Sequence, residues 1–262
     1  MKVGIITASL LMETKDALRK AKDMGAHGVQ LWVANNDLDP SRLSQSGRQE
    51  LLTFMDGIGL ERSALCGDIG GFANPVTVDE NVSRTKAMFD LCVDLKTPIL
   101  TTHVGVLPKD KSSKDYAGLL AAVREVAVYA AERECCFANE TGLESGPGLA
   151  AFLDAIGSEG AQVNFDPANL CMNGFDVLEA VGALGGRIVH THAKDGVFDS
   201  AKTGFQEVPL GEGDVDFPIY LKALRDTGFD GYLTIERECG DDPVGDIAAA
   251  IAFLKAQDGV EQ

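Results

Sequence analysis

The chain contains little histidine, little tryptophan and little positive charge. It has four histidines and one tryptophan in 262 residues, and 23 Lys and Arg residues stand against 40 Asp and Glu residues. The formal net charge is −17. A balance of this sign repels the phosphate backbone, and no basic run offsets it locally. We therefore expect no nucleic-acid partner.

Several common sequence signals are also missing. No apolar stretch approaches the length of a membrane span, so we expect no membrane association. None of the six cysteines forms a CxxC pair, which favours reduced, packed cysteines and a cytoplasmic location. The apolar run from Val3 to Met12 follows a single positive charge and has no clear cleavage site, so a buried first strand explains it better than a signal peptide. No GxSxG, P-loop, HExxH or dinucleotide fingerprint occurs.

What the chain does contain is a repeated alternation of strand and helix patterns. Hydrophobic residues make up 45% of it, enough for a sizeable core. Most strand candidates lack the alternation of a half-exposed strand, which is typical of strands buried on both faces. The eight strand candidates are residues 2–7, 28–33, 61–66, 98–103, 135–140, 162–166, 187–194 and 231–236. Amphipathic helical patterns cover residues 14–24, 78–95, 113–133, 217–227 and 245–256.

Eight successive strand–helix units predict an α/β fold, a single (β/α)8 TIM barrel. A doubly wound open sheet is the alternative, but the turn after the first strand, Ala8-Ser9-Leu10, lacks the glycine-rich pattern of that fold. No linker interrupts the chain, so we expect one domain over residues 1–262. Long loops at 67–77, 105–112 and 195–215 follow strand ends on the active face of such a barrel. The last, 21 residues long, is expected to cover the site.

Four polar residues each end a strand candidate in the second half of the chain. They are Glu140, Asp166, His192 and Glu236, and the first three are spaced 26 residues apart. Three carboxylates and one imidazole suit a hard or borderline divalent cation such as Mn, Mg, Co or Zn. Taken singly, Glu140 is also consistent with a helix cap or a surface ion pair, and Asp166, which precedes a proline, with the start of a helix. Together the four predict one metal site, and therefore an enzyme.

Other residues near the same strand ends are candidates for contact with a substrate. His103 ends the fourth strand and suits substrate binding, proton transfer or a purely structural role. Trp32 near the end of the second strand suits an apolar wall or simple core packing. Lys194 extends the strand face of His190 and His192 and suits an anionic or hydroxyl oxygen. His190 is expected to lie deeper, behind the ligand His192.

Five motifs together resemble the xylose isomerase-like TIM-barrel superfamily, which includes the sugar phosphate isomerase/epimerase family. The motifs are NETG at 139–142, NFDPAN at 164–169, HTHAKD at 190–195, PLGEGDVDF at 209–217 and GYLTIERE at 231–238. The resemblance covers nearly the whole chain. It implies a divalent-metal-dependent isomerase or epimerase of a ketose or sugar phosphate, acting by proton transfer through a metal-stabilised enediolate. It also implies that Glu140 and Glu236 are both metal ligands and the proton-transfer pair.

The substrate residues depart from the pattern of the ketose epimerases. Asn169 stands three residues after the metal aspartate, where those enzymes usually have a histidine. They also tend to carry an arginine after the metal histidine, where this chain has only Lys194 and Lys202. We take His103, Asn169, Lys194 and Trp32 as the substrate-binding candidates.

Two other functions remain open on the same barrel. A metal-dependent dehydratase of the inosose or dehydroshikimate type begins with the same proton abstraction, and a non-catalytic sugar- or metal-binding barrel needs none. An endonuclease IV-type function is disfavoured because it needs a multi-zinc cluster with more histidines and a basic groove. The expected partner is a small sugar or polyol-derived substrate. The resemblance also implies a possible homo-oligomer.

Overall fold

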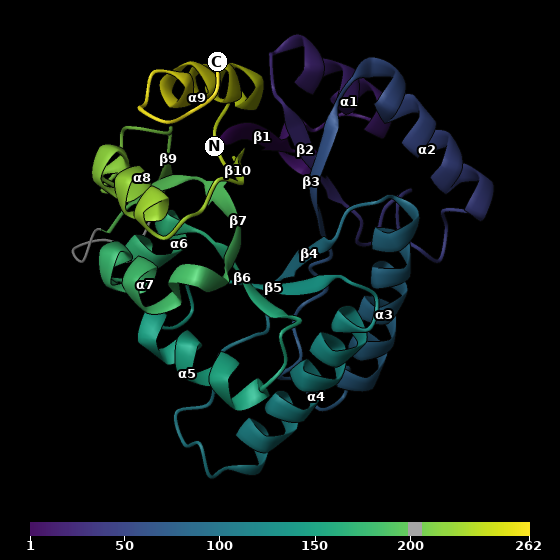
Figure 1. Cartoon of the computed structure of the whole chain (residues 1–262), viewed down its shortest axis with the longest axis vertical. Helices are drawn as coiled ribbons and strands as arrows, with labels where there is room; N and C mark the ends of the chain where they lie inside the picture. The colour runs from purple at the N-terminus through teal and green to yellow at the C-terminus, as the bar shows by residue number, and fades with distance from the viewer. Residues whose placement is uncertain (199–205) are drawn as a thin grey trace.

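Eight parallel strands close into a barrel in the computed structural model, which describes residues 1–198 and 206–262 (Figure 1). Around the barrel the strand order is β1-β10-β7-β6-β5-β4-β3-β2. The strands are β1 (Lys2–Ile6), β2 (Gly28–Trp32), β3 (Glu61–Cys66), β4 (Ile99–Thr102), β5 (Cys136–Glu140), β6 (Ala161–Phe165), β7 (Ile188–Ala193) and β10 (Tyr232–Ile235). The predicted (β/α)8 TIM barrel is confirmed.

Helices surround the barrel and cover the outer faces of its strands (Figure 1). They are α1 (Thr14–Asp23), α2 (Gln45–Ile58), α3 (Val78–Asp94), α4 (Lys114–Ala131), α5 (Gly146–Ile156), α6 (Pro167–Met172), α7 (Val177–Leu184), α8 (Phe217–Asp226) and α9 (Pro243–Lys255), with short 3-10 turns η1 (Thr7–Leu10) and η2 (Gly185–Arg187). Ser113 shows how the sequence sets a helix start, because its hydroxyl accepts the backbone N–H of Tyr116. Among the described residues, no helix combines the length and hydropathy that a membrane crossing requires.

The barrel interior is polar where the strands approach their carboxyl ends. Fully buried Gln30, Thr101, Asn164, His190 and Thr234 point into a shared hydrogen-bond network, whereas apolar side chains fill the space between strands and helices. Because the strands are covered on both faces, most of their sequences lack polar–apolar alternation, although β6 (Ala161–Phe165) shows it. The fold therefore presents polar groups along its axis, where a site can form.

Strand register fixes the level at which these polar groups meet. Glu140 on β5 pairs with Asn164 on β6, which pairs with His190 on β7. On the other side of β7, His192 pairs with Thr234 on β10. Neighbouring parallel strands thus bring residues that are far apart in sequence to the same end of the barrel.

The long segment after β7 is not a plain loop. It begins with β8 (Asp195–Val197) and continues in β9 (Gln206–Val208), and the two strands pair antiparallel. Residues 199–205, part of the segment expected to cover the site, lie outside the described residues. The predicted loop at 195–215 therefore contains two short strands, and the expectation that it covers the site stays a prediction.

Candidate metal centre

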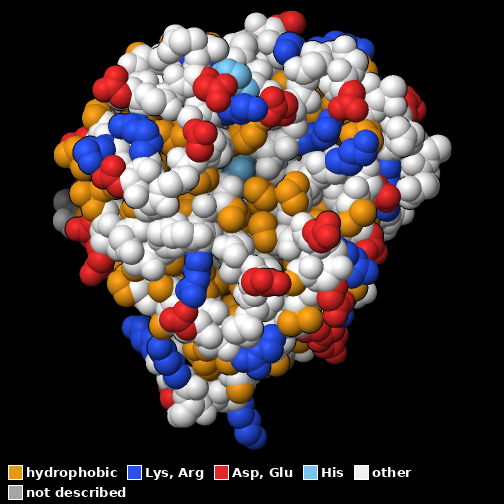
Figure 2. Space-filling view, in the orientation of Figure 1, with side chains coloured by type: hydrophobic (Ala, Val, Ile, Leu, Met, Phe, Trp, Pro, Cys, Tyr) orange, Lys and Arg blue, Asp and Glu red, His pale blue; other side chains and the backbone are white. Residues whose placement is uncertain are grey.

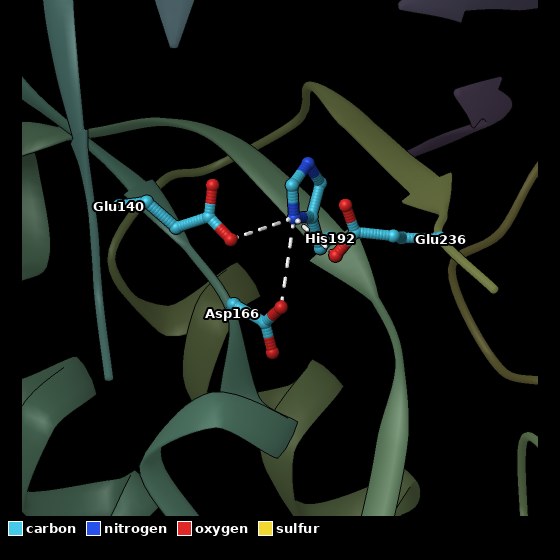
Figure 3. Close-up of side chains that lie close together, drawn as sticks. All are labelled: Glu140, Asp166, His192 and Glu236. Carbon is cyan, nitrogen blue, oxygen red and sulfur yellow. Dashed lines mark ion pairs between the residues drawn. The ribbon is translucent and has the colours of Figure 1, made fainter. Parts of the chain in front are cut away.

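The structure brings the four predicted ligands together at the carboxyl end of the barrel. Glu140 ends β5, Asp166 follows β6, His192 lies on β7 and Glu236 follows β10. One ligand atom from each lies within 4.8 Å of all the others. The three carboxylates point toward a single nitrogen of the His192 ring (Figure 3). This nitrogen, Nδ1, lies 3.2 Å from Glu140 Oε1, 3.5 Å from Asp166 Oδ2 and 3.3 Å from Glu236 Oε2.

Gln30 determines which nitrogen of His192 faces the carboxylates. Its side-chain Nε2 donates to Thr101 Oγ1 at 2.7 Å, so its Oε1 is left as an acceptor 2.9 Å from His192 Nε2. The donor Asn164 Nδ2 also lies 3.3 Å from Nε2, but it already donates to Glu140 Oε2 at 3.2 Å, so the shorter contact to Gln30 favours a proton on Nε2 of the imidazole. In the neutral ring this leaves a lone pair on Nδ1, the nitrogen that faces the carboxylates.

Two buried atoms of this cluster have no hydrogen-bond partner among the described residues. They are His192 Nδ1 and Asp166 Oδ2. Buried polar atoms are rarely left without a partner, and buried carboxylates need a compensating positive charge. Ligands that each lie about 2.1 Å from one ion are separated by about 3 to 3.5 Å, which is the spacing found between Nδ1 and the carboxylate oxygens. The donor set and its spacing fit a divalent metal ion.

The charges of the cluster depend on one another. Burial lowers the pKa of His192, but Glu236 and Glu140 outweigh burial and raise it well above its ordinary value. For Glu236, burial acts to raise the pKa, and His192 and Lys194 reverse the effect and lower it. Without a metal the imidazole therefore holds a proton where a cation would otherwise lie.

His103 lies at the edge of the cluster and is oriented by an acid that sequence reasoning did not select. Its Nδ1 lies 2.8 Å from Asp68 Oδ2, and its Nε2 lies 3.7 Å from Glu140 Oε1. Glu140 raises the pKa of His103, burial lowers it, and the hydrogen bond to Asp68 raises it further, to about 9. The side chain is 33% exposed, so a protonated imidazole faces the mouth of the barrel.

A cavity of about 160 Å³ opens over the cluster. Its wall contains all four predicted substrate-binding residues together with Glu140 and Glu236. The four are Trp32, His103, Asn169 and Lys194. Asn169 donates from Nδ2 to Glu140 Oε1 at 3.1 Å, and so occupies the position beside the ligand where a histidine was expected from the family pattern. Lys202, the other basic candidate, lies outside the described residues.

Sequence reasoning missed three residues that touch the cluster or its mouth. Asp68 follows β3 and resembles the other strand-end acids, a signal that could have identified it. Asn164 lies on β6, two residues before Asp166, and its Nδ2 donates to Glu140 Oε2 at 3.2 Å. Gln30 gave no signal, because one glutamine inside an apolar strand predicts nothing about its partner.

Comparison with known proteins places the barrel in a family. The family model described as xylose isomerase-like TIM barrel matches residues 18–257. The chain belongs to this family. The crystal structure of a xylose isomerase domain protein from Planctomyces limnophilus is 26% identical, with a TM-score of 0.84 over 97% of this chain and 95% of that one.

Two curated proteins match shorter segments of the chain. The L-ribulose-5-phosphate 3-epimerase UlaE of Escherichia coli is 37% identical over 95 residues, 35% of this chain and 32% of that protein. An inosose dehydratase of Clostridium perfringens is 32% identical over 88 residues, 28% of this chain and 29% of that protein. These matches thus span about a third of each curated relative.

Proposed function

We propose that this protein is a divalent-metal-dependent isomerase or epimerase that moves a proton on a carbon next to the carbonyl of a sugar. The observation that carries the proposal is the buried cluster in which His192 Nδ1 and Asp166 Oδ2 lack hydrogen-bond partners while three carboxylates converge on one point. Membership of the xylose isomerase-like TIM barrel family and local similarity to a sugar-phosphate epimerase and an inosose dehydratase support it. Glu140, Asp166, His192 and Glu236 would hold one Mn, Mg, Co or Zn ion.

The bound ion would act as a Lewis acid on the substrate's oxygen atoms. Glu140 and Glu236 come from β5 and β10, which lie on opposite sides of β7 in the barrel. One carboxylate removes the proton from carbon, and the electron pair of the broken C–H bond moves toward the carbonyl oxygen to give an enediolate. The other glutamate, which must first take up a proton from solvent, returns that proton to carbon, from the opposite face in an epimerase, and exchange with solvent then restores both carboxyl groups. Lys194, whose Nζ donates to Glu236 Oε2 at 3.0 Å, holds one of the two carboxylates in place.

The test is deuterium incorporation at carbon in heavy water. Protein stripped with a chelator and reloaded with each of the four metals is incubated with ketoses of five and six carbons and followed by proton NMR. We expect metal-dependent loss of the C–H signal beside the carbonyl. Glu236→Gln should lower the exchange rate by about a thousandfold or more, because it removes a group that acts on the reacting proton.

The matched control is Glu159→Gln, an exposed glutamate between α5 and β6 at the other end of the barrel. It should exchange at the rate of the unaltered protein. Full exchange in Glu236→Gln would contradict the mechanism. Tight sugar binding with no exchange under any metal would instead support a non-catalytic binding barrel.

One observation favours a dehydratase as the second candidate. A lyase needs an acid near the departing hydroxyl, and His103, held by Asp68 with its Nε2 toward the cavity, is placed to be one. Loss of water beside a carbonyl gives a conjugated product that absorbs ultraviolet light. An increase in ultraviolet absorbance during incubation with an inosose or dehydroshikimate would favour this reaction over epimerisation, provided that His103→Ala abolishes the increase.

A further inference from the structure

We infer that the substrate is an unphosphorylated sugar or polyol-derived ketone. One relative, the epimerase UlaE, acts by its name on a sugar phosphate instead. The inference rests on the proposed function, because it concerns the ligand of the same cavity. It is drawn from the charges around the cavity and from the carboxylate that fills the glycine-rich turn at 209–215. A phosphate needs an unmatched cation or a set of free backbone N–H groups.

Lys194, the lysine in the cavity wall, already forms ion pairs with acidic side chains. Lys194 is 3% exposed and donates to Glu236 and Glu238, and Glu207 lies 4.0 Å away. A lysine held in this way is a fixed partner of carboxylates, and binding a phosphate there would require it to leave them.

The other cations near the cavity are matched as well. His103 is held by Asp68 at 2.8 Å. Arg237, in the wall of an adjoining cavity of about 260 Å³, contacts Glu207 at 2.6 Å and Asp246 at 2.8 Å. Among the residues that the structure describes, no Lys, Arg or His in the walls of these two cavities lacks an acidic partner.

The glycine-rich turn after β9 would otherwise suit a phosphate, but an internal carboxylate fills it. Asp195 accepts the backbone N–H groups of Gly196 at 2.9 Å, Gly211 at 2.9 Å, Gly213 at 3.0 Å and Val215 at 3.2 Å. A Cβ on Gly213 would lie 2.1 Å from Asp195 Oδ1, so the turn closes tightly around this side chain. The N–H groups that could bind an anion from solution are already bound to Asp195.

The net charge around the metal position and the cavity mouth also favours an unphosphorylated substrate. Five carboxylates surround the metal position and the mouth, from Asp68, Glu140, Asp166, Glu236 and Glu238. Even with full positive charge on Lys194 and His103, together with the two charges of a divalent ion, four positive charges stand against five carboxylates, so the site stays negative when loaded. Repulsion between like charges disfavours the binding of a phosphate dianion here and leaves a neutral sugar unaffected.

The test compares free sugars with their own phosphates on the whole metal-loaded chain. Calorimetric Kd values are measured with Mn²⁺-loaded protein for L-ribulose and L-ribulose 5-phosphate, and for D-xylulose and D-xylulose 5-phosphate. We expect the free sugar of at least one pair to bind ten times more tightly than its phosphate, or more. Tighter binding of both phosphates, or binding of none of the four, would overturn the inference.

Charge-changing variants separate electrostatics from shape. Glu238→Gln removes an acid that faces Lys194, so the preference for the free sugar should narrow by at least threefold. Glu159→Gln changes the net charge equally but lies far from the cavity, and the preference should stay the same. An equal narrowing in both variants, or none in Glu238→Gln, would count against the inference.

Deuterium exchange, read separately in the same samples, keeps the two proposals distinguishable. Preferential binding of the free sugar without exchange at carbon would leave the inference standing and remove the proposed function. Deuterium exchange at carbon combined with tighter binding of both phosphates would support the proposed function and remove the inference about the substrate.

Discussion

Gln30 acts on the candidate metal centre through another residue, by fixing the proton of His192 on Nε2. We predict that Gln30→Met, which keeps the volume and removes the acceptor, lowers metal affinity by about 10- to 100-fold. The imidazole loses the partner that holds Nδ1 free for the ion. Competition with a fluorescent chelator measures the change, and circular dichroism checks that the barrel is retained.

Gln162→Met is the matched control for that prediction. Gln162 is on β6, and its Nε2 donates to the backbone of Glu159, away from the cluster. Its replacement should leave metal affinity within twofold. Equal affinity in the two variants would show that Gln30 does not orient His192.

At the scale of single residues, the sequence identified the four residues that cluster better than the residues that hydrogen-bond to them. Glu140, Asp166, His192 and Glu236 could be selected because a charged or imidazole side chain at the end of an apolar strand is costly without a function. Gln30 and Asn164 could not be selected in this way, because a buried side-chain amide can form hydrogen bonds with many kinds of neighbour. Which neighbour it meets depends on barrel closure, which joins β2 to β7 across the interior.

Among the elements, the segment from β8 to α8 depends on a single side chain. Asp195 accepts four backbone N–H groups, and an asparagine at this position offers one oxygen and places an NH₂ group against donors. We predict that Asp195→Asn lowers the free energy of unfolding by about 2 to 4 kcal/mol, measured by urea denaturation. Asp241→Asn, at an exposed position, should change it little. Equal stability of both variants would contradict the anchoring role.

Periodicity identified some elements and failed for others for physical reasons. The patterns at 78–95 and 217–227 correspond to α3 (Val78–Asp94) and α8 (Phe217–Asp226), where apolar stripes are regular. Helix α5 was not predicted from the sequence because it begins Gly146-Pro147-Gly148, residues typical of turns. The pair β8–β9 escaped because strands of three residues are too short to show a period.

At the scale of the whole molecule, alternation of strand and helix patterns predicted the barrel, because right-handed crossover connections leave few other arrangements. The excess of acids gave no information about the fold. The space-filling view shows acidic and basic side chains mixed over one face rather than a continuous basic area (Figure 2). What composition could not show is that the acids near the mouth match its cations, since that depends on which loops meet there.

Binding of the metal ion to the whole chain should release a proton from His192. Because Glu236 and Glu140 raise the pKa of His192 well above its ordinary value, the metal-free protein carries a proton on this ring at neutral pH. An ion that takes its place must displace that proton. We expect about one ion per chain, about one proton released per ion, and an affinity that rises about tenfold per pH unit while the ring remains protonated. Calorimetry in buffers of different ionisation enthalpy measures the proton count.

Metal removal should also lower stability, because the ion binds only the folded barrel. At a free concentration 100 times its Kd, the ion adds about 2.7 kcal/mol to the free energy of unfolding. Glu140→Gln should reduce this gain, since it removes one ligand, whereas Glu159→Gln should preserve it. An affinity independent of pH between 6 and 8 would show that His192 holds no proton to displace. Several ions per chain would show that the four residues are not the whole metal site.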